Sequence, residues 1–454
     1  MDHPQPATSN LQHPTTHRVV VTGMGIVCPL GHDVETTWRA VLAGQSGAGR
    51  TTIFDASTYP TQFDCEVKDY DLARHVKHPH LHRQGNRGCQ FALGAAVQAC
   101  HQAGIEVETD TVQDGIDRTR MGIYLGSGEG GVDAEVFFPA LVAAWDQAAG
   151  RMDWLQWAQV EFGRSLPSQV LEQEPNMPAA HLAVLTGARG PVRSCLTACA
   201  ASTQAIGEAM MLVRHGHADV MITGGCHSMI HALGVMGFSR LTALSTRNDS
   251  PQTASRPFSA TRDGFVIGEG AGILIFESLD SARRRGRPIL AEVIGYGSSA
   301  DAFRVTDMHD EGRGPVQAIR AALKDAGLSP ADVDYINAHG TSTAENDSIE
   351  SLAIRTVFGG QAKRPPVSSI KGAMGHLIGA AGAAELITCV LALRDQTIPP
   401  TANLTDRDPA LDLDYVAIRP RKAALEVVMK ESFGFGGQNN VVLIRRFAEE
   451  SAGH

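Results

Sequence analysis

A cysteine at the start of a helix of small residues is the first candidate for chemistry. Cys199 lies in PVRSCLTACAASTQAIG, where a strand is predicted to become a helix that runs to about Arg214. A thiol at a helix start feels unpaired backbone N–H groups and the positive end of the dipole, which both favour the thiolate. Ala198, Ala200 and Ala201 leave room for an incoming thioester. Buried inert cysteines are common, so the local pattern leaves a nucleophile and a packing residue both open.

Two histidines lie beside glycines at predicted ends of secondary structure. His339 is in YINAHGTSTAEND, directly after a predicted strand, and His376 is in SSIKGAMGHLIGAAGAAE, at the start of a second apolar helix. A helix N-terminus disfavours the imidazolium, and a neutral ring can donate a hydrogen bond to a carbonyl that gains negative charge. Taken singly, each histidine could be structural. If the two helix starts converge, they place a nucleophile and an imidazole at one site.

A glycine-rich loop near the C-terminus is a third candidate. The run ESFGFGGQNN contains Phe433, Phe435 and Gly436. Alternating glycines let backbone N–H groups point at a ligand, and the phenylalanines can gate an apolar channel. The same run also fits a tight turn without a chemical role.

The elements that must position these residues occur twice along the chain. Strand-like runs with glycine turns open each half, at 18–30 and 290–299, and a nearly uninterrupted apolar helix follows in each, at 199–214 and 377–393. Further strand-like runs are DVMIT at 219–223, AGILIF at 271–276 and VDYINA at 333–338. Strands that alternate with buried helices predict an α/β fold with covered sheets. We expect an N-terminal arm over 1–17, two related halves over 18–280 and 281–447, and a tail over 448–454.

Composition narrows the class of protein. A hydrophobic share of 43% supports a large core, and a net charge of −10 argues against sequence-independent binding of nucleic acid. No apolar run is long enough for a membrane span, and the first residues lack a secretory signal. The eight cysteines lack the spacing of a zinc site or a disulfide framework, and the turn between Cys195 and Cys199 disfavours a redox pair. We expect a cytoplasmic protein without a metal or another cofactor.

Two segments stand out by composition. The stretch 129–176 holds Trp145, Trp154 and Trp157 amid Ala, Leu and Gln, so it is predicted to be helical and to need a surface that covers its aromatics. That surface could be the core, a subunit interface or a ligand pocket. The loop 75–82 contains four histidines and reads as an exposed loop more readily than as a metal site.

Together these motifs resemble the β-ketoacyl-acyl carrier protein synthases of the thiolase-like fold, in particular the elongating type II enzymes with a Cys-His-His triad. The similarity covers about residues 18–447, and its motifs occur in the family's order: TAC at 197–199, LSTRND at 244–249, SRPF and RDGFVIGEGAG within 255–272, NAHGTST at 337–343, GHLIGAAGAAE at 375–385 and SFGFGG at 432–437. The resemblance implies a layered αβαβα fold with two pseudo-symmetric halves. It also implies an acyl carrier protein as partner and a homodimer.

The resemblance assigns a role to each candidate residue. Cys199 takes an acyl group, and His339 and His376 stabilise the enolate that forms when malonyl-carrier protein loses carbon dioxide. Phe435 is a gate and, with Cys199, a backbone oxyanion donor beside Gly436. The remaining implied residues are the polar supports Lys371, Glu385, Asp347 and Glu350 and the substrate-binding residues Phe238, Thr341, Thr343 and Phe433.

Departures from the family pattern leave alternatives open. The stretch 129–176 is longer and more aromatic than usual, and His227 occupies a position that is usually acidic. Lys77, Arg83 and Arg87 could form a basic patch for the acidic carrier protein. A thiolase would need a second catalytic cysteine where the SFGFGG loop has phenylalanine. A chain-length-factor subunit typically lacks the nucleophile, whereas a dedicated synthase for a polyketide, polyene or unusual lipid shares all these residues.

Overall fold

The structure is a computed structural model. It describes residues 16–109, 111–130, 134–165, 170–304, 307–359 and 364–449. The predicted arm over 1–17 and tail over 448–454 therefore fall almost entirely outside the described residues. In the described part of the chain, every helix is too short or not apolar enough to cross a membrane.

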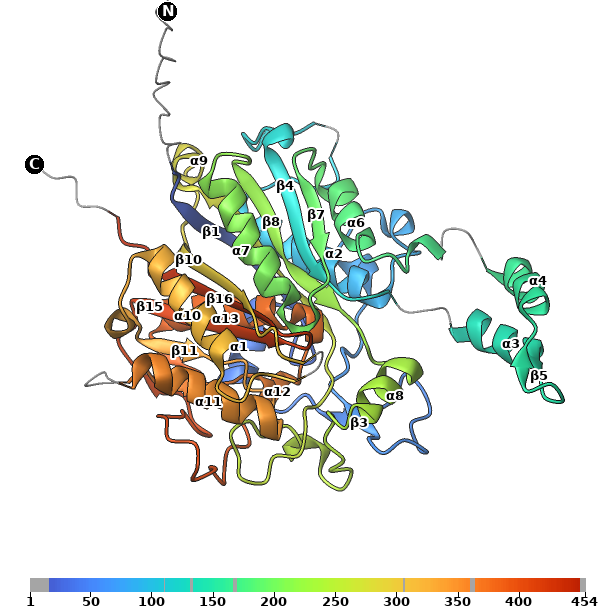
Figure 1. Ribbon diagram of the computed structural model, residues 1–454. Helices are drawn as coiled ribbons and strands as arrows, with labels where there is room; N and C mark the ends of the chain where they lie inside the picture. The colour runs from blue at the N-terminus through green and yellow to red at the C-terminus, as the bar shows by residue number, and fades with distance from the viewer. Residues whose placement is uncertain are drawn as a thin grey trace, which may run out of the picture.

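A ten-stranded mixed sheet runs through the molecule (Figure 1). Its longer strands are continuous buried runs rich in Val and Ile, as expected for strands that are covered on both faces. In sheet order the strands are β12 (Val367–Ser368), β11 (Tyr335–Asn337), β15 (Val427–Gly434), β16 (Gln438–Arg445), β10 (Ala291–Ala300), β1 (Val19–Val27), β9 (Gly270–Ser278), β8 (Val220–His227), β4 (Met121–Ser127) and β7 (Val192–Cys195).

The sheet has two halves with the same topology. Read outward from the antiparallel pair β1–β10, one half runs β1-β9-β8-β4-β7 and the other runs β10-β16-β15-β11-β12. Each half begins with antiparallel pairs, and its two outermost pairings are parallel. This repeated order confirms the predicted pair of pseudo-symmetric halves.

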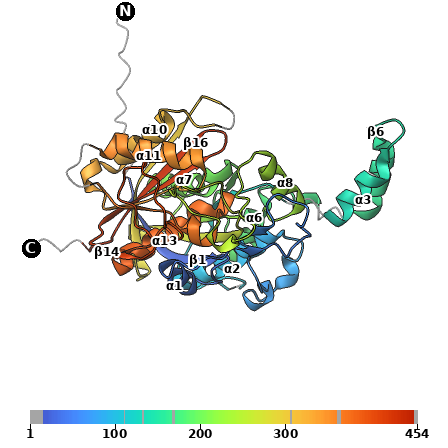
Figure 2. The same cartoon turned by 90° about the horizontal axis from the view of Figure 1, so that it is seen from below.

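Two central helices pack between the halves of the sheet. Helix α7 (Ala201–Arg214) contacts β4 and β8 from one half and β16 from the other, and α13 (Ala381–Asp395) contacts β9 and β15 in the same way. On the outer faces, α2 (Arg87–Ala103) covers β1 and β9, whereas α10 (Arg313–Ala326) covers β10 and β16. The layers visible in Figure 2 are therefore helix, sheet, helix, sheet, helix, as the resemblance implies.

Shorter elements complete the body. The helices are α1 (Val34–Leu42), α6 (Met177–Thr186), α8 (Ala232–Arg240), α9 (Leu279–Arg284), α11 (Ala344–Phe358) and α12 (Lys371–Met374). The two-stranded pairs are β2 (Gly49–Arg50) with β3 (Phe63–Asp64) and β13 (Thr397–Ile398) with β14 (Arg421–Lys422). The 3-10 turns are η1 (Leu72–Arg74), η2 (Pro79–Leu81), η3 (Arg118–Arg120), η4 (Ala198–Ala200), η5 (Pro251–Thr253), η6 (Pro330–Asp332) and η7 (Ile378–Ala380).

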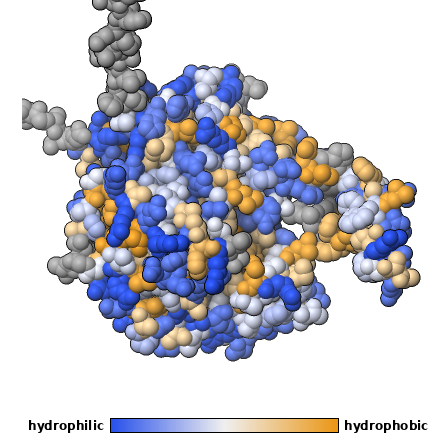
Figure 3. Space-filling model, viewed as in Figure 1, coloured by the Kyte–Doolittle hydropathy of each residue, from blue (hydrophilic) through white to orange (hydrophobic). Residues whose placement is uncertain are grey.

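The tryptophan-rich segment forms an arm that projects from the body (Figures 1 and 2). The arm consists of α3 (Ala134–Ala144), the strand pair β5 (Trp145–Asp146) and β6 (Arg151–Met152), and α4 (Trp154–Arg164). Its helices confirm the predicted secondary structure. Trp154 and Phe162 are 66% and 86% exposed, and Figure 3 shows apolar residues along the arm. The chain itself therefore leaves part of the arm's apolar surface uncovered.

Candidate active site

Cys199 lies in a strained turn between β7 and α7. The expected helix start is the 3-10 turn η4, and the α-helix begins two residues later, at Ala201. Ala198 has a φ of 49°, a left-handed conformation that costs a residue with a Cβ about 1 kcal/mol. Cys199 is 3% exposed and packs in an apolar cluster with Phe265 and Ile378. The turn thus holds the thiol inside the molecule, at the point where the two halves meet.

His339 is fixed from both its backbone and its ring. Its backbone N–H donates to Glu350 Oε1 over 2.6 Å, and the N–H of Gly340 donates to Glu350 Oε2 over 2.7 Å. Lys371 Nζ donates to the His339 carbonyl oxygen over 2.6 Å and lies 3.3 Å from its Nδ1. Because an ammonium is only a donor, Nδ1 must accept, and the neutral ring carries its proton on Nε2.

His376 has the same tautomer for a different reason. The backbone N–H of Ile378 donates to its Nδ1 over 3.2 Å, so the proton of the neutral ring is again on Nε2. Nε2 is buried and has no hydrogen-bond partner among the described residues. The pKa of each imidazole lies well below 6.5, first because burial disfavours the charged ring and then because Lys371 repels it. Both rings are therefore neutral donors at neutral pH.

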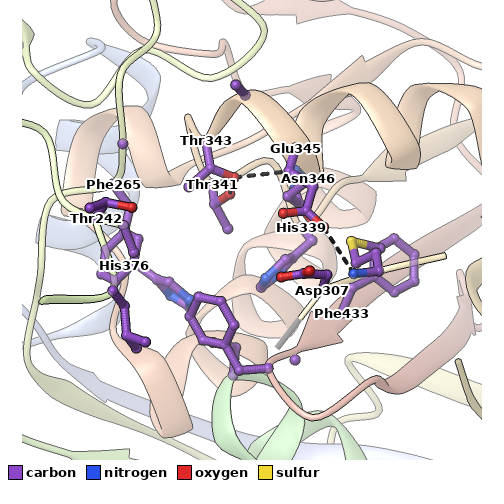
Figure 4. Close-up of a pocket in the computed structure, with 18 of the residues that line it drawn as sticks. Thr242, Phe265, Asp307, His339, Thr341, Thr343, Glu345, Asn346, His376 and Phe433 are labelled. Carbon is purple, nitrogen blue, oxygen red and sulfur yellow. Dashed lines mark hydrogen bonds between the residues drawn. The ribbon is translucent and has the colours of Figure 1, made fainter. Parts of the chain in front are cut away.

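The structure brings the three predicted residues together. One side-chain ligand atom of each of Cys199, His339 and His376 lies within 4.8 Å of the other two. The imidazole centroids are 5.3 Å apart and nearly perpendicular, and Figure 4 shows both rings at the same cavity. Within the described ranges these are also the residues spaced closely enough to ligate a metal ion, but a protonated thiol would have to lose its proton first.

Burial reverses the expected effect of the helix start on Cys199. Desolvation raises the pKa of the thiol to about 11, although Lys371 and the backbone N–H groups of Phe435 and Cys199 act in the opposite direction. The donors at the turn do favour the thiolate, as expected, but the loss of water outweighs them, so the net shift favours the protonated thiol. These are the two N–H groups that the resemblance implies as oxyanion donors, and both act on the Cys199 sulfur.

The three residues face a cavity of about 340 Å³. Thr341, Thr343, Phe433 and Phe435 line it, and the two threonine hydroxyls lie 2.9 Å apart. Phe238 is placed differently: it packs edge-on against Phe265, within the apolar cluster that holds Cys199. Gly436 is exposed and has a φ of 90°, a conformation that favours glycine, so it allows the chain to turn in this loop.

A buried ionic network supports the histidines. Lys371 Nζ pairs with Glu385 Oε1, and Lys430 Nζ lies 2.7 Å from Glu385 Oε2, with all three side chains at most 2% exposed. Burial raises the pKa of Glu350 to about 7. Asp347 does not reach the cavity lining; it accepts the backbone N–H groups of Thr341 and other loop residues.

Sequence reasoning missed Lys430. The signal was present, because the run VVMKESFG places Lys430 and Glu431 in a strand whose other residues predict burial. Burial raises the pKa of Glu431 well above its usual value, and the neighbouring Glu350 adds to the shift. Charged residues inside a buried strand indicate pairing with distant groups.

The expected basic patch is only partly free. Lys77, Arg83 and Arg87 are all exposed, but Arg87 also binds the buried Glu269 at 2.6 Å. The histidine loop is also not exposed throughout: His82 is buried, with its Nδ1 2.9 Å from Nδ1 of His181. Arg87 therefore has a structural partner in this chain.

Comparison with known proteins identifies the family. The β-ketoacyl synthase N-terminal domain matches residues 16–282, and the β-ketoacyl synthase C-terminal domain matches residues 290–405. The chain belongs to the β-ketoacyl synthase family. It is 40% identical to 3-oxoacyl-[acyl-carrier-protein] synthase 2 of Coxiella burnetii, over 94% of this chain and 98% of the relative. The enzyme of the same name from Staphylococcus aureus (strain COL) is also 40% identical, over 95% and 98%.

Solved ketosynthases share the fold. A β-ketoacyl synthase from Burkholderia phymatum is 32% identical with a TM-score of 0.82, and the match covers 95% of this chain and 100% of the other. A complex of a type II polyketide synthase acyl-carrier protein with its ketosynthase matches with 33% identity, a TM-score of 0.83 and the same coverage. The ishigamide ketosynthase/chain length factor matches with 34% identity, a TM-score of 0.83 and again that coverage. This ketosynthase is thus an acyl-transferring condensing enzyme with a thiolase-like fold.

Proposed function

We propose that this ketosynthase condenses an acyl group held on Cys199 with malonyl-acyl carrier protein, with loss of carbon dioxide. The observation that carries the proposal is the convergence of one buried thiol and two buried, neutral imidazoles within 4.8 Å at a single cavity. The relatives named 3-oxoacyl-[acyl-carrier-protein] synthase 2 support the reaction and the carrier protein as substrate bearer.

The first half-reaction transfers the acyl group. The Cys199 sulfur attacks the thioester carbonyl of acyl-carrier protein, the bond from that carbon to the carrier sulfur breaks, and the thiol proton ends on the released carrier thiol. Because burial raises the thiol pKa to about 11, the sulfur gains nucleophilicity only as this proton leaves. The backbone N–H groups of Cys199 and Phe435 stabilise the oxyanion of the tetrahedral intermediate.

The second half-reaction uses the histidines. Malonyl-carrier protein loses carbon dioxide, and its thioester oxygen becomes an enolate oxygen that accepts hydrogen bonds from Nε2–H of His339 and His376. The enolate carbon then attacks the acyl carbon on Cys199, the carbon–sulfur bond breaks, and the thiolate takes up a proton. Lys371 and Ile378 N–H hold the tautomers that aim these donors.

We propose that the enzyme is a homodimer. Among the described residues, strand β7 is bonded only to β4 and lies at the edge of the sheet, with Val192 44% exposed, so a second copy could extend the sheet there. The second copy would then also bury the exposed apolar residues of the arm. Sedimentation equilibrium should give twice the chain mass, and Phe162→Asp should weaken the dimer.

We further propose residue 280 as the boundary between the halves. It lies in α9 (Leu279–Arg284), which separates β9, the last strand of one half, from β10, the first strand of the other.

A dedicated polyketide synthase is the second candidate. The solved ketosynthases include one bound to a hexaketide and a ketosynthase/chain length factor. A non-catalytic chain-length-factor role is disfavoured, because Cys199 faces the same cavity as both histidines. Assays with a ladder of acyl-carrier substrates distinguish the two synthase candidates.

The test separates the half-reactions. Cys199→Ala should abolish acyl labelling from radiolabelled acyl-carrier protein, whereas Cys195→Ala, a matched cysteine change outside the cavity, should retain it. His376→Asn keeps an acceptor for the Ile378 N–H but removes the Nε2 donor, so it should retain labelling and lose malonyl decarboxylation by about 100-fold. Labelling that persists in Cys199→Ala, or equal loss of both half-reactions in His376→Asn, would contradict the mechanism.

A further inference from the structure

A second cavity lies at the carboxyl ends of two neighbouring parallel strands. Its volume is about 250 Å³, and its lining includes Ser127 at the end of β4 and His227 at the end of β8. Gly128 and His231 also line it. None of these residues belongs to the proposed reaction, so the cavity needs a separate explanation.

His227 presents an unused donor to this cavity. The residue is 5% exposed, and its Nδ1 accepts the N–H of Gly379 over 3.2 Å. Burial lowers the pKa of the ring to about 4, with Glu129 opposing this shift, so the neutral ring carries its proton on Nε2. Nε2 has no partner among the described residues, and it lies 1.8 Å from where a Cβ on Gly128 would be.

His231, four residues further along the chain, has the same arrangement. It is the N-cap of α8, and its Nδ1 accepts the N–H of Gly234 over 3.2 Å. Its proton is therefore also on Nε2, which is buried and lacks a partner within the described ranges. Two buried N–H donors without acceptors are costly unless a ligand or water accepts from them.

The second cavity lies next to the apolar cluster that contains Cys199. Cys199 packs in one apolar cluster with Ile230 and Ile378. Ile230 also lines the second cavity, and Gly379, which follows Ile378, donates to His227. The apolar cluster that contains Cys199 therefore extends to the lining of the second cavity.

We infer that the second cavity receives the distal part of the acyl group on Cys199 and selects chains that carry a ketone or hydroxyl oxygen. This inference rests on the proposed function. The Nε2–H groups of His227 and His231 donate to that oxygen, which an unsubstituted alkyl chain cannot replace.

The charges at the cavity narrow the ligand further. Glu129 lines the cavity and is exposed, so it repels a chain that ends in a carboxylate. Arg87 lines the cavity too, but Glu269 already holds its guanidinium with contacts of 2.6 to 2.9 Å. A neutral oxygen is the group that fits two neutral donors beside one carboxylate.

A competition assay tests the inference on the full-length enzyme. Equal amounts of octanoyl-carrier protein and 7-oxooctanoyl-carrier protein, and in a second run 5-oxooctanoyl-carrier protein, compete for Cys199, and intact mass spectrometry reads the ratio of the two acyl-enzymes. At least one oxo chain should load in about tenfold preference to octanoyl, the gain expected from one or two neutral hydrogen bonds.

The variants remove only the donors. His227→Asn and His231→Asn keep a side-chain oxygen for the N–H of Gly379 or Gly234 but lack the distal N–H. Each should lower the oxo-to-octanoyl ratio by about fivefold, and His217→Asn, an exposed control, should leave it unchanged. Because the ratio is internal to each sample, partial unfolding does not alter it.

The outcomes separate the two proposals. If no chain loads on Cys199, the proposed function itself is wrong. If octanoyl loads as well as both oxo chains, or if the ratio is the same in His227→Asn and His231→Asn as in the parent, the inference is overturned while the function stands.

Discussion

The turn before α7 and the turn before α13 have the same backbone and different side chains. Each is a three-residue 3-10 turn whose first residue, Ala198 or Ile378, has a φ of 49°. The next position is Cys199 in one half and Gly379 in the other. One turn supplies a nucleophile, whereas the other supplies a backbone N–H to His227. The repeated fold therefore provides two equivalent places at the centre, and the side chains decide which one reacts.

The charged support is also unequal between the halves. Lys371, Glu385 and Lys430 all come from the second half, and so do both catalytic histidines. The first half contributes a thiol in an apolar cluster. The ionic groups that support the histidines and the desolvated sulfur therefore come from different halves, although the thiol and both imidazoles face one cavity.

Replacing the nucleophile should have the largest effect. Cys199→Gly gives the first turn the residue that the second turn has. We expect condensation to fall at least about 1,000-fold, because no covalent intermediate can form. Steady-state product formation measures the loss, and circular dichroism checks that the variant is folded. Substantial remaining turnover would show that the first turn is not the reactive one.

The contact between the two central helices should give the next largest effect. A Cβ on Gly382 of α13 would lie 2.0 Å from Oγ1 of Thr203 on α7. Gly382→Ala should therefore lower the free energy of unfolding by about 2 kcal/mol, as overpacking does elsewhere. Urea denaturation measures the change.

A matched glycine provides the control for that experiment. Gly163 lies in α4 of the arm, where a Cβ would meet nothing within 4 Å. Gly163→Ala should leave stability unchanged or raise it by about 0.5 kcal/mol, through helix propensity. If both alanines have the same effect, the central helices do not pack as closely as described.

Removing one ammonium should give the smallest effect, and it depends on pH. Burial and then the two lysines depress the pKa of His376. Lys430→Met should raise this pKa, so the ring protonates at higher pH, and its Nδ1–H then opposes the Ile378 N–H. The acid limb of the decarboxylation rate should move up by roughly one pH unit. Lys324→Met, an exposed lysine on α10, should not move it. If the acid limb does not move in Lys430→Met, Lys430 does not influence the pKa of His376.

Much of the fold could be predicted because its signals are local. Continuous apolar runs predicted the buried strands and the helices 199–214 and 377–393, and the repetition of this order predicted two halves. The segment 129–176 was predicted to be helical, but its projection from the body was not predicted. The surface that covers an aromatic side chain comes from other parts of the chain or from a partner, so neighbouring residues do not reveal it. The net shift of the Cys199 pKa could not be predicted for a similar reason. The effect of a helix start is local, whereas burial depends on the whole core.

The sequence by itself determined which residue types stand beside which turns: Cys199, His339, His376 and the glycine loop carry their signal in neighbouring residues. Only the tertiary structure decided the partners that make them work. Lys430 forms an ion pair with Glu385, and His227 accepts the N–H of Gly379, although the two residues of each pair are far apart in the sequence. Protonation depends on desolvation, which arises only when the chain packs into its core, and the tautomer of His339 depends on Lys371, 32 residues away in the sequence.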